Sequence, residues 1–565
     1  MGEEIRETEV CIIGAGAAGG IMALELARRG IGVVVLESGP RHDLARRGDY
    51  SRRFVKGENP WESPLKGIDR YTTGGSVGYR LEWNRARGVG GSTLHWEGTT
   101  LRLRADDFRM RTLHGVAEDW PISYEEIEPY YGKAERALGV AGTPDDPWAS
   151  PRSTAFPLPP FPMSFSDGFF ARACRKLDIA FHHVPQARNS LAYGGRSQCR
   201  ACGTCHVCPT GAKASTDLTH IPQAVATGHA DVVTDATVLR LEVDGSGQVR
   251  SVVYAGGDRR ERRLSARLFV VAAGGVETAR LLLLSASPDF PRGLANRSGL
   301  VGRYFTSHPM IDVTGRVAER VYPYRIGFST AMSGQFAVPR DRQRRGAFLL
   351  EFLNSAGPLP GEIAPVSGAW GTALGPRVKA EFGRTLGIRI YAEQLPNAAN
   401  TVTLNAGVTD YFGQPVPHIT YGIGPYERAA LKEAEEVAAR ILAMLGAEDI
   451  QSGPLSYASH QLGTHRMGGD RTQSVVNANL RAHDVPNLYL VGGGTFVTVS
   501  SSPPTLTIAA LAIRTAEHIA EVYRGGGTTR GTHRSSVPAT GMVTGMPSLA
   551  QSAHPRYSLG PEGTL

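Results

Sequence analysis

The chain has 565 residues, 41% of them hydrophobic, so it can bury a large core, and its length suggests about two to four domains. Its 61 basic and 53 acidic residues are intermixed, without the basic and aromatic stripe of a nucleic-acid-binding protein. Sixty-eight glycines and thirty-six prolines without a period exclude a fibrous protein and indicate a loop-rich α/β protein. The N-terminus, MGEEIRETEV, has no secretory segment, and no window holds about eighteen apolar residues. The sequence by itself therefore predicts a cytoplasmic protein without a transmembrane segment.

The stretch 8–39 has the pattern of a dinucleotide-binding unit. It reads as an apolar strand, a glycine turn, an alanine-rich helix and a second apolar strand that ends at Glu37. Gly14 permits the tight turn, Gly16 lets the backbone approach a pyrophosphate, and Gly19 allows close packing of the helix. Glu37 is placed to accept hydrogen bonds from an adenosine ribose. The expected cofactor contacts of this unit are Gly14, Gly16, Ala17, Ala18, Gly19 and Glu37.

Further motifs follow along the chain. They are RARGVGGSTLHW from Arg85, VVAAGGVETARLLLLS from Val270, HQLGTHRMGGD from His460 and the glycine-rich stretch from Asn487. With these motifs the sequence resembles the glucose-methanol-choline (GMC) family of FAD oxidoreductases, in family order up to about Val522. The resemblance implies an α/β fold, with a Rossmann-like FAD-binding domain assembled from discontinuous segments and an antiparallel-sheet substrate domain.

The resemblance also implies domain bounds. The FAD-binding domain takes residues 1–310, including a lid-like segment 40–70 and a cysteine loop 195–215, and returns at 456–523. The substrate domain takes 311–455, where TLGIRIYAEQL, NTVTLN and PHITY are strand-like and a helix from Tyr426 to about Leu445 packs against them. Residues 524–565 are rich in Gly, Ser, Thr and Pro, which predicts a disordered tail.

Outside the first unit, the resemblance implies further contacts with FAD. His95, followed by Trp96, matches the histidine that pyranose oxidases of this family bond covalently to the flavin methyl carbon. A covalent bond would prevent loss of the cofactor, and a non-covalent polar contact is the alternative. These further expected contacts are Arg87, Gly90, Gly91, Ser92, His95, Trp96, Val238, Ala273, Gly274, Gly493 and Thr505.

His460 matches the family histidine that takes the hydroxyl proton while the alcohol carbon gives a hydride to flavin N5. An imidazole suits this role because its pKa lies near neutrality. His465 is the rival position and matches no family role. The family usually places a second His or Asn where this chain has Pro503, which has no side-chain donor. The Ser502 hydroxyl, which also suits a helix cap, or a residue of the substrate domain is expected to replace it.

Four of the six cysteines, Cys199, Cys202, Cys205 and Cys208, lie within ten residues. Their spacing resembles a ferredoxin run shortened by one residue at the last step. Some GMC dehydrogenases carry such a loop before C-P-x-G-A-K, and in the glucose dehydrogenases it binds a [3Fe-4S] cluster. A [3Fe-4S] or [4Fe-4S] cluster is therefore favoured; zinc, c-type haem and a redox disulfide are alternatives. Cys11 and Cys174 are expected to be buried packing residues.

Together these features predict an FAD-dependent dehydrogenase. It would oxidise a hydroxyl of a sugar, glycoside, sugar acid or polyol to the carbonyl, and its electrons would leave through the iron-sulfur cluster. The alternatives are a pyranose-oxidase-like enzyme that uses oxygen and has a structural zinc, and a flavin-bearing lyase of the same fold. The resemblance also implies a small chaperone-like subunit, a cytochrome or quinone acceptor, and periplasmic export with that subunit as the alternative to a cytoplasmic location.

Overall fold

The computed structural model describes residues 5–82, 84–321 and 326–525. Contacts divide the chain into the units Met1–Glu521 and Val522–Leu565, and the fold below is that of the first. The expected disordered tail lies outside the described residues from 526 onward, whereas Arg524 and Gly525 belong to the last helix, α12 (Thr505–Gly525). The three predicted domain bounds inside the first unit stay a prediction. Within the described ranges, no helix combines the length and apolar character that a membrane crossing needs.

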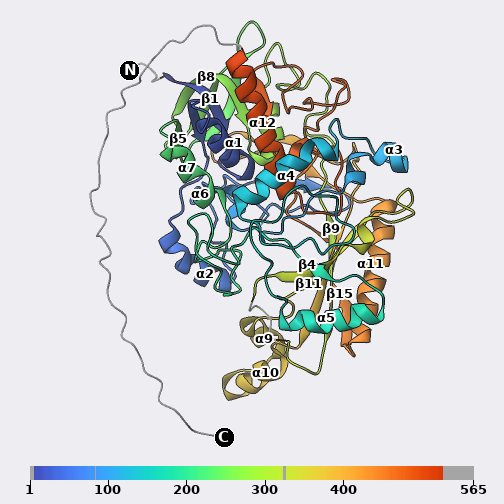
Figure 1. The fold of residues 1–565 in the computed structure, drawn as a ribbon. Helices are drawn as coiled ribbons and strands as arrows, with labels where there is room; N and C mark the ends of the chain where they lie inside the picture. The colour runs from blue at the N-terminus through green and yellow to red at the C-terminus, as the bar shows by residue number, and fades with distance from the viewer. Residues whose placement is uncertain (1–4, 83, 322–325, 526–565) are drawn as a thin grey trace. The chain divides into compact units, whose positions relative to one another are not determined.

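The first sheet contains the predicted dinucleotide unit. Its strands run in the order β5, β2, β1, β8, β7, β6, with β17 also paired to β8. β1 pairs in parallel with β2 and β8, and α1 connects β1 to β2, which confirms the predicted strand, helix and strand. Figure 1 shows β1, β5 and β8 beside α1, α6 and α7. The bounds are β1 (Ile5–Ile13), α1 (Ala17–Ala27), β2 (Val33–Leu36), β5 (Ala230–Val233), β6 (Thr237–Val243), β7 (Val249–Ala255), β8 (Glu261–Val271) and β17 (Leu488–Leu490).

The second sheet is antiparallel and has one apolar face. Its order is β15, β9, β12, β11, β10, β4, with β16 also paired to β9. α11 (Pro425–Met444) confirms the predicted helix and contacts β9, β11 and β12, and α5 (Phe165–Lys176) contacts α11 (Figure 1). Ile388 and Ile390 are buried in the core between the sheet and these helices. The strands are β4 (His182–His183), β9 (Pro309–Arg316), β10 (Ser329–Ser333), β11 (Phe348–Leu353), β12 (Thr385–Ala392), β15 (Glu448–Ser452) and β16 (Ser456–Tyr457).

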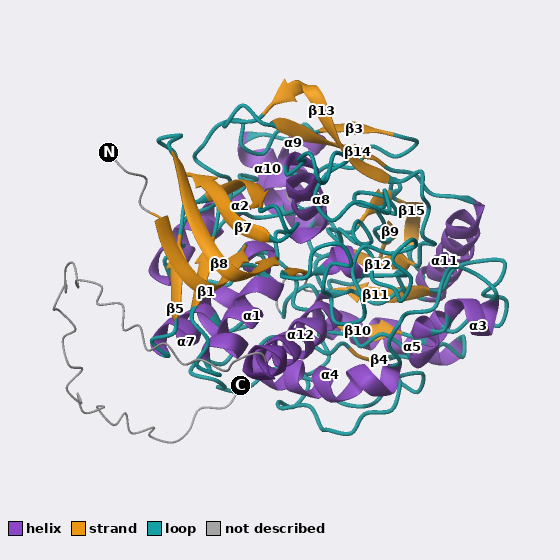
Figure 2. Cartoon of the chain, turned by 90° about the horizontal axis from the view of Figure 1, so that it is seen from above, coloured by secondary structure: helices purple, strands orange, loops and turns teal. Residues whose placement is uncertain are grey.

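A third sheet changes one expectation. The stretches NTVTLN and PHITY do not join the large antiparallel sheet; they form β13 (Thr401–Thr409) and β14 (Pro415–Thr420), which pair with each other and with β3 (Thr72–Gly74). Figure 2 shows these three strands beside α8 (Gly274–Leu284), the helix that follows β8. Arg280 of α8 holds them there, because it donates to the Pro415 carbonyl at 2.9 Å and to Asp410 at 2.7 Å.

The remaining helices and 3₁₀ turns connect the strands of the three sheets. In the lid-like segment 40–70, a 3₁₀ turn (Leu44–Arg46) and α2 (Arg47–Val55) are followed by turns. The other α-helices are α3 (Met110–His114), α4 (Tyr124–Leu138), α6 (Thr216–Thr219), α7 (Ile221–Ala226), α9 (Pro360–Ser367) and α10 (Leu374–Glu381). Further 3₁₀ turns span Gly91–Leu94, Ala105–Phe108, Gln335–Ala337, Gly371–Ala373 and Gly493–Thr495.

Candidate active site

A cavity of about 460 Å³ is lined by segments of both large sheets. One part of its wall is formed by the β1–α1 turn, the loop 84–99 and the start of α8. Another part is formed by side chains of β9 and β12, by the segment 457–462 and by the first residues of α12. Segments that are hundreds of residues apart in the sequence therefore share one cavity.

The β1–α1 turn presents unpaired backbone donors to this cavity. Gly16 is the N-cap of α1, no side chain caps the helix, and its first turn contains no acidic residue. The first N–H groups of the helix and the positive end of its dipole are thus available to an anion. A β-carbon on Gly91 would lie 2.7 Å from the Gly16 α-carbon, and one on Gly14 would lie 2.7 Å from the Ala272 carbonyl oxygen. This geometry fits the pyrophosphate of a dinucleotide.

Most of the expected cofactor contacts line the cavity, and two do not. Gly19 packs against the Gly14 carbonyl oxygen, where a β-carbon would lie at 1.9 Å, as its expected packing role requires. Gly90 donates its backbone N–H to the Ala15 carbonyl at 3.1 Å. The expected contacts that do line the cavity are Gly14, Gly16, Ala17, Ala18, Glu37, Arg87, Gly91, Ser92, His95, Trp96, Val238, Ala273, Gly274, Gly493 and Thr505.

Glu37 joins three backbone segments beside the turn. Its carboxylate accepts N–H groups from Ala15 at 2.8 Å, Gly39 at 2.9 Å and Gly88 at 3.1 Å. Burial raises the pKa of Glu37, and these three N–H groups and Arg87 oppose the rise. The carboxylate therefore fixes the turn and the loop 85–91 relative to each other.

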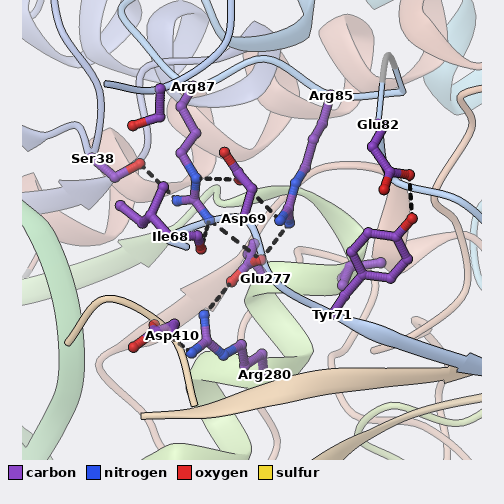
Figure 3. A network of polar contacts seen from close by, with 12 residues as sticks. Ser38, Ile68, Asp69, Tyr71, Glu82, Arg85, Arg87, Glu277, Arg280 and Asp410 are labelled. Atoms are coloured by element: carbon purple, nitrogen blue, oxygen red, sulfur yellow. Dashed lines mark hydrogen bonds and ion pairs between the residues drawn. The ribbon is translucent and has the colours of Figure 1, made fainter. Parts of the chain in front are cut away.

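A network of ion pairs joins the lid-like segment, the loop 85–91 and α8 (Figure 3). Asp69, from the lid-like segment, accepts from Arg87 at 2.7 Å and from Arg85 at 3.0 Å. Glu277 of α8 pairs with Arg85, with Arg280 at 3.2 Å and with Arg87 at 3.6 Å. Arg87 also donates at 3.1 Å to the hydroxyl of Ser38, the residue after Glu37 just past the end of β2. Sequence reasoning identified only Arg87 in this network, because the acidic partners come from distant segments.

His95 lines the cavity, and its Nε2 atom is buried and makes no hydrogen bond. Burial lowers the pKa of His95 to about 3, and Lys213 and His206 add to the effect, so the ring is neutral. Lys213 donates to the carbonyls of Leu94 at 3.2 Å and Trp96 at 2.6 Å. The unpaired nitrogen is available to a flavin in either a covalent or a polar contact.

His460 lines the cavity and is paired with a histidine that sequence reasoning missed. Its Nδ1 lies 2.9 Å from Nδ1 of His308, which is fully buried immediately before β9. Burial and the neighbouring His308 lower the pKa of His460 well below its usual value. Burial lowers the pKa of His308 to about 4, opposed by the backbone of Ser500 and Ser502. Both rings are therefore neutral near neutral pH.

The direction of the hydrogen bond between the two rings depends on the tautomer of each ring. Nε2 of His308 is buried and makes no hydrogen bond within the described part of the chain. In the tautomer that has the shared proton on Nδ1 of His460, Nε2 of His460 is an unprotonated base.

Ser502, the second expected catalytic residue, and the rival position His465 do not line the cavity. Ser502 is buried outside the residues that line the cavity, whereas Pro503 and Pro504 do line it. His465 is also outside the lining and is fully buried, with its Nδ1 3.1 Å from the Thr464 hydroxyl. The chain therefore brings His308, and not Ser502, to His460.

The cysteine loop adjoins the cavity through His206. This side chain lines the cavity, and its Nδ1 lies 2.9 Å from the His95 carbonyl oxygen. In the sequence, His206 directly follows Cys202 and Cys205, and this C-x-x-C-H pattern was the basis of the c-type haem alternative. In the structure it connects the cysteine loop to the loop that carries His95.

Two of the four clustered thiols lie beside one guanidinium, and a third accepts a backbone N–H group. The sulfur atoms of Cys199 and Cys205 lie 3.8 Å and 3.7 Å from the same Arg188 Nη1, and Cys208 accepts the Lys213 backbone N–H at 3.2 Å. Cys202 is exposed. Burial raises the pKa of Cys205 to about 11, and Arg188 and Lys213 oppose the rise. Across the described part of the chain, no group of three or more His, Cys, Asp or Glu residues is arranged to hold a metal ion. The expected ligand set is thus not assembled in this structure.

The parallel strands β5, β2, β1 and β8 of the first sheet, the glycine cradle and the neutral histidine pair are together the features of a dinucleotide-binding oxidoreductase. The GMC oxidoreductase family models match residues 12–310 and 396–512, and the chain belongs to this family. Membership supports FAD as the cofactor, and the residues around the cavity fit it.

Named relatives and one solved structure agree with this assignment. The fructose dehydrogenase large subunit of Gluconobacter japonicus is 32% identical over 92% of this chain and 99% of that relative. The 2-methyl-1,2-propanediol dehydrogenase of Mycolicibacterium austroafricanum is 30% identical over 92% of this chain and 96% of that relative. A formate oxidase variant from Aspergillus oryzae, studied for its FAD modification, has a TM-score of 0.64 at 15% identity and covers 93% of this chain and 100% of its own. That likeness shows the fold alone.

The glycine cradle predicts the effect of one methyl group. Gly91→Ala would place a β-carbon 2.7 Å from Gly16, at a backbone φ of +50°. We expect the purified variant to hold several-fold less FAD, measured from the ratio of visible flavin absorbance to protein absorbance. Gly30→Ala is the matched control, because Gly30 also has a positive φ, +77°, but has no atom within 4 Å of the added methyl. Equal FAD content in the two variants would contradict the cradle.

Proposed function

We propose that this chain is an FAD-dependent dehydrogenase that oxidises a hydroxyl group of a sugar or polyol to a carbonyl. The observation that carries the proposal is the neutral His308–His460 pair at the wall of the cavity that also contains the dinucleotide cradle. FAD, when bound, supplies the two-electron acceptor. The names of the fructose and diol dehydrogenase relatives support a polyhydroxylated substrate.

His460 takes the proton in this reaction. The substrate hydroxyl would give its proton to Nε2 of His460, and bound FAD would supply the acceptor for the hydride of the same carbon. One proton and one hydride then leave the alcohol, which becomes the carbonyl. In the tautomer that this step needs, Nδ1 of His460 donates to Nδ1 of His308, and this hydrogen bond orients the His460 ring. The lowered pKa of His460 then favours release of the proton.

The cysteine loop is the proposed exit for electrons. Cys199, Cys205 and Cys208, with Cys202 as a further ligand, would hold an iron-sulfur cluster, and the cluster would supply one-electron transfer. Arg188 and Lys213 support this assignment, because they oppose the rise that burial causes in the pKa of Cys205 and so favour the thiolate that ligates metal. The name of the fructose dehydrogenase large subunit supports a partner subunit for the next acceptor, a cytochrome or a quinone.

Replacement of the base tests the reaction. His460→Ala removes the proton acceptor but leaves the cradle intact, so FAD content stays normal and substrate-driven flavin reduction slows by about 10²- to 10⁴-fold. Stopped-flow absorbance under anaerobic conditions measures this rate. The control is His229→Ala, an exposed histidine of a surface turn. A reduction rate for His460→Ala within about tenfold of the unchanged protein would exclude His460 as the base.

His308 acts as a positioning residue, and its replacement has a separate signature. His308→Ala removes a neighbour that lowers the pKa of His460, so the acid limb of the flavin-reduction pH profile moves to higher pH. His308→Asn keeps an acceptor oxygen and should restore part of the rate at neutral pH. A reduced rate with an unshifted profile would mean that His308 only supports packing.

Metal analysis tests the electron exit. We expect protein purified anaerobically to contain iron and acid-labile sulfide, and we expect Cys205→Ser to lose most of both because a buried ligand is removed. Cys174→Ser is the matched control, since Cys174 is also buried but lies in α5. Stoichiometric zinc without iron in the unchanged protein would overturn the cluster and favour a structural metal.

A further inference from the structure

The antiparallel sheet has a charged row on the face opposite its apolar core. Asp312 of β9 pairs in register with Arg389 of β12, and Arg389 pairs in register with Glu351 of β11. Directly opposed residues project from the same face of a sheet, so acid, guanidinium and acid lie side by side. The alternate residues Ile388 and Ile390 project into the core on the other face. Arg389 lines the cavity that contains His460.

The donors of Arg389 are directed at carboxylates. Its Nε and Nη2 donate to Asp312 at 2.8 Å and 2.9 Å, and its Nη1 donates to Glu97 at 3.2 Å. Glu97 also lines the cavity. Burial would lower the pKa of Arg389, but Tyr391, Asp312 and Glu97 raise it well above its usual value, so the guanidinium keeps its charge. Two carboxylates therefore surround one cation, and the local charge is negative.

We call Glu97, Asp312, Arg389 and Tyr391 the charged wall. Glu351, the next residue of the charged row after Arg389, adds a third carboxyl group behind it. It is 1% exposed and accepts the Ser329 hydroxyl at 2.5 Å. Burial and Glu97 raise the pKa of Glu351 to about 7, and Arg389, Ser329 and Tyr391 oppose the rise. Tyr391 lines the cavity, and its ring centre lies 6.4 Å from that of His460. The wall thus reaches the proposed base.

The other cations of the cavity are equally compensated. Arg85, Arg87 and Arg280 pair with the acids Asp69, Glu277 and Asp410 (Figure 3). Among the described residues, no lysine lines the cavity. Lys213, buried nearby, is bound by the carbonyls of Leu94 and Trp96. An anionic substrate would therefore meet the Glu97 carboxylate in the cavity that contains His460, and no unpaired cation of the described cavity lining.

We propose that Glu97, Arg389 and Tyr391 bind the hydroxyl groups of a neutral sugar or polyol beside His460, and that the surplus carboxylates exclude sugar acids. This inference rests on the proposed function and narrows its substrate class. A carboxylate accepts from hydroxyl groups, a guanidinium donates to them and a phenol does both, which suits adjacent hydroxyls. A substrate carboxylate would be repelled strongly, because the low dielectric of a buried site magnifies charge interactions.

A pair of ligands that differ by one charge tests this inference. D-gluconamide and D-gluconate carry the same hydroxyl groups, but only gluconate is an anion at neutral pH. Calorimetric titration into the oxidised, FAD-loaded protein without an electron acceptor measures both dissociation constants. We expect gluconamide to bind at least about tenfold more tightly than gluconate at pH 8.

Charge-neutral variants locate the source of the preference. Glu97→Gln removes one negative charge at nearly constant shape. It should reduce the ratio of the gluconate to the gluconamide dissociation constant at least about threefold. Glu436→Gln, on the exposed side of α11, is the matched control and should leave it unchanged. Normal FAD content and melting temperature show that each variant is folded.

The titration of Glu351 gives the preference a pH dependence. Glu351 faces Glu97, Arg389 and Tyr391 across the wall and Ser329 from β10, and its deprotonation above pH 7 adds negative charge. The preference for gluconamide should therefore grow from pH 6 to pH 8, and Glu351→Gln should remove this growth.

Each outcome has a distinct meaning. Equal affinities, tighter binding of gluconate, or no binding of either ligand overturns the charged-wall inference. The proposed function can survive that result, because flavin reduction by neutral sugars or polyols is measured separately. Failure of all such compounds to reduce the flavin would overturn the proposed function itself.

Discussion

The close approach of three backbone segments is the constraint on which the candidate site depends. The β1–α1 turn lies against the end of β8 at Gly14 and against the loop 88–91 at Gly91, and in both places a β-carbon would lie 2.7 Å from backbone. Glu37 then binds N–H groups of the turn and of that loop. Because these contacts are made by backbone, the helix donors of α1 stay open to the cavity. The turn therefore keeps backbone donors for a cofactor phosphate free of side-chain caps.

Paired charges hold the rest of the cavity wall in place. Asp69 comes from the lid-like segment, Glu277 from α8 and Asp410 from the turn between β13 and β14. Three arginines, Arg85, Arg87 and Arg280, join them into one network. Removing a buried member such as Asp410, whose side chain is 3% exposed, costs about 3–5 kcal/mol, because the charge of Arg280 stays buried. The same compensation recurs at Arg389, so the arginines shape the cavity without making it attractive to anions.

Strand pairing places the proposed base beside its partner. β16 pairs with β9 at Met310, and the Ala458 backbone N–H donates to the His308 carbonyl at 3.0 Å. His308 precedes β9 and His460 follows β16, so this short antiparallel pair brings the two rings together. The sequence predicted Ser502 or a residue of the substrate domain 311–455 in place of the side chain that Pro503 lacks. His308 lies just before that range, in the predicted FAD-binding range 1–310, and matches neither alternative.

The sequence by itself determined the features that depend on local spacing. The dinucleotide unit and α11 follow from glycine positions and hydrophobic periodicity within a few dozen residues. The choice of His460 as the candidate base came from the short motif that begins at this residue. Only the tertiary structure decided which sheet β13 and β14 join, that His308 meets His460, and that Glu97 and Asp312 surround Arg389. These contacts depend on strand register and on segments distant in the chain, and a register is fixed by packing across the sheet, which a linear pattern does not contain.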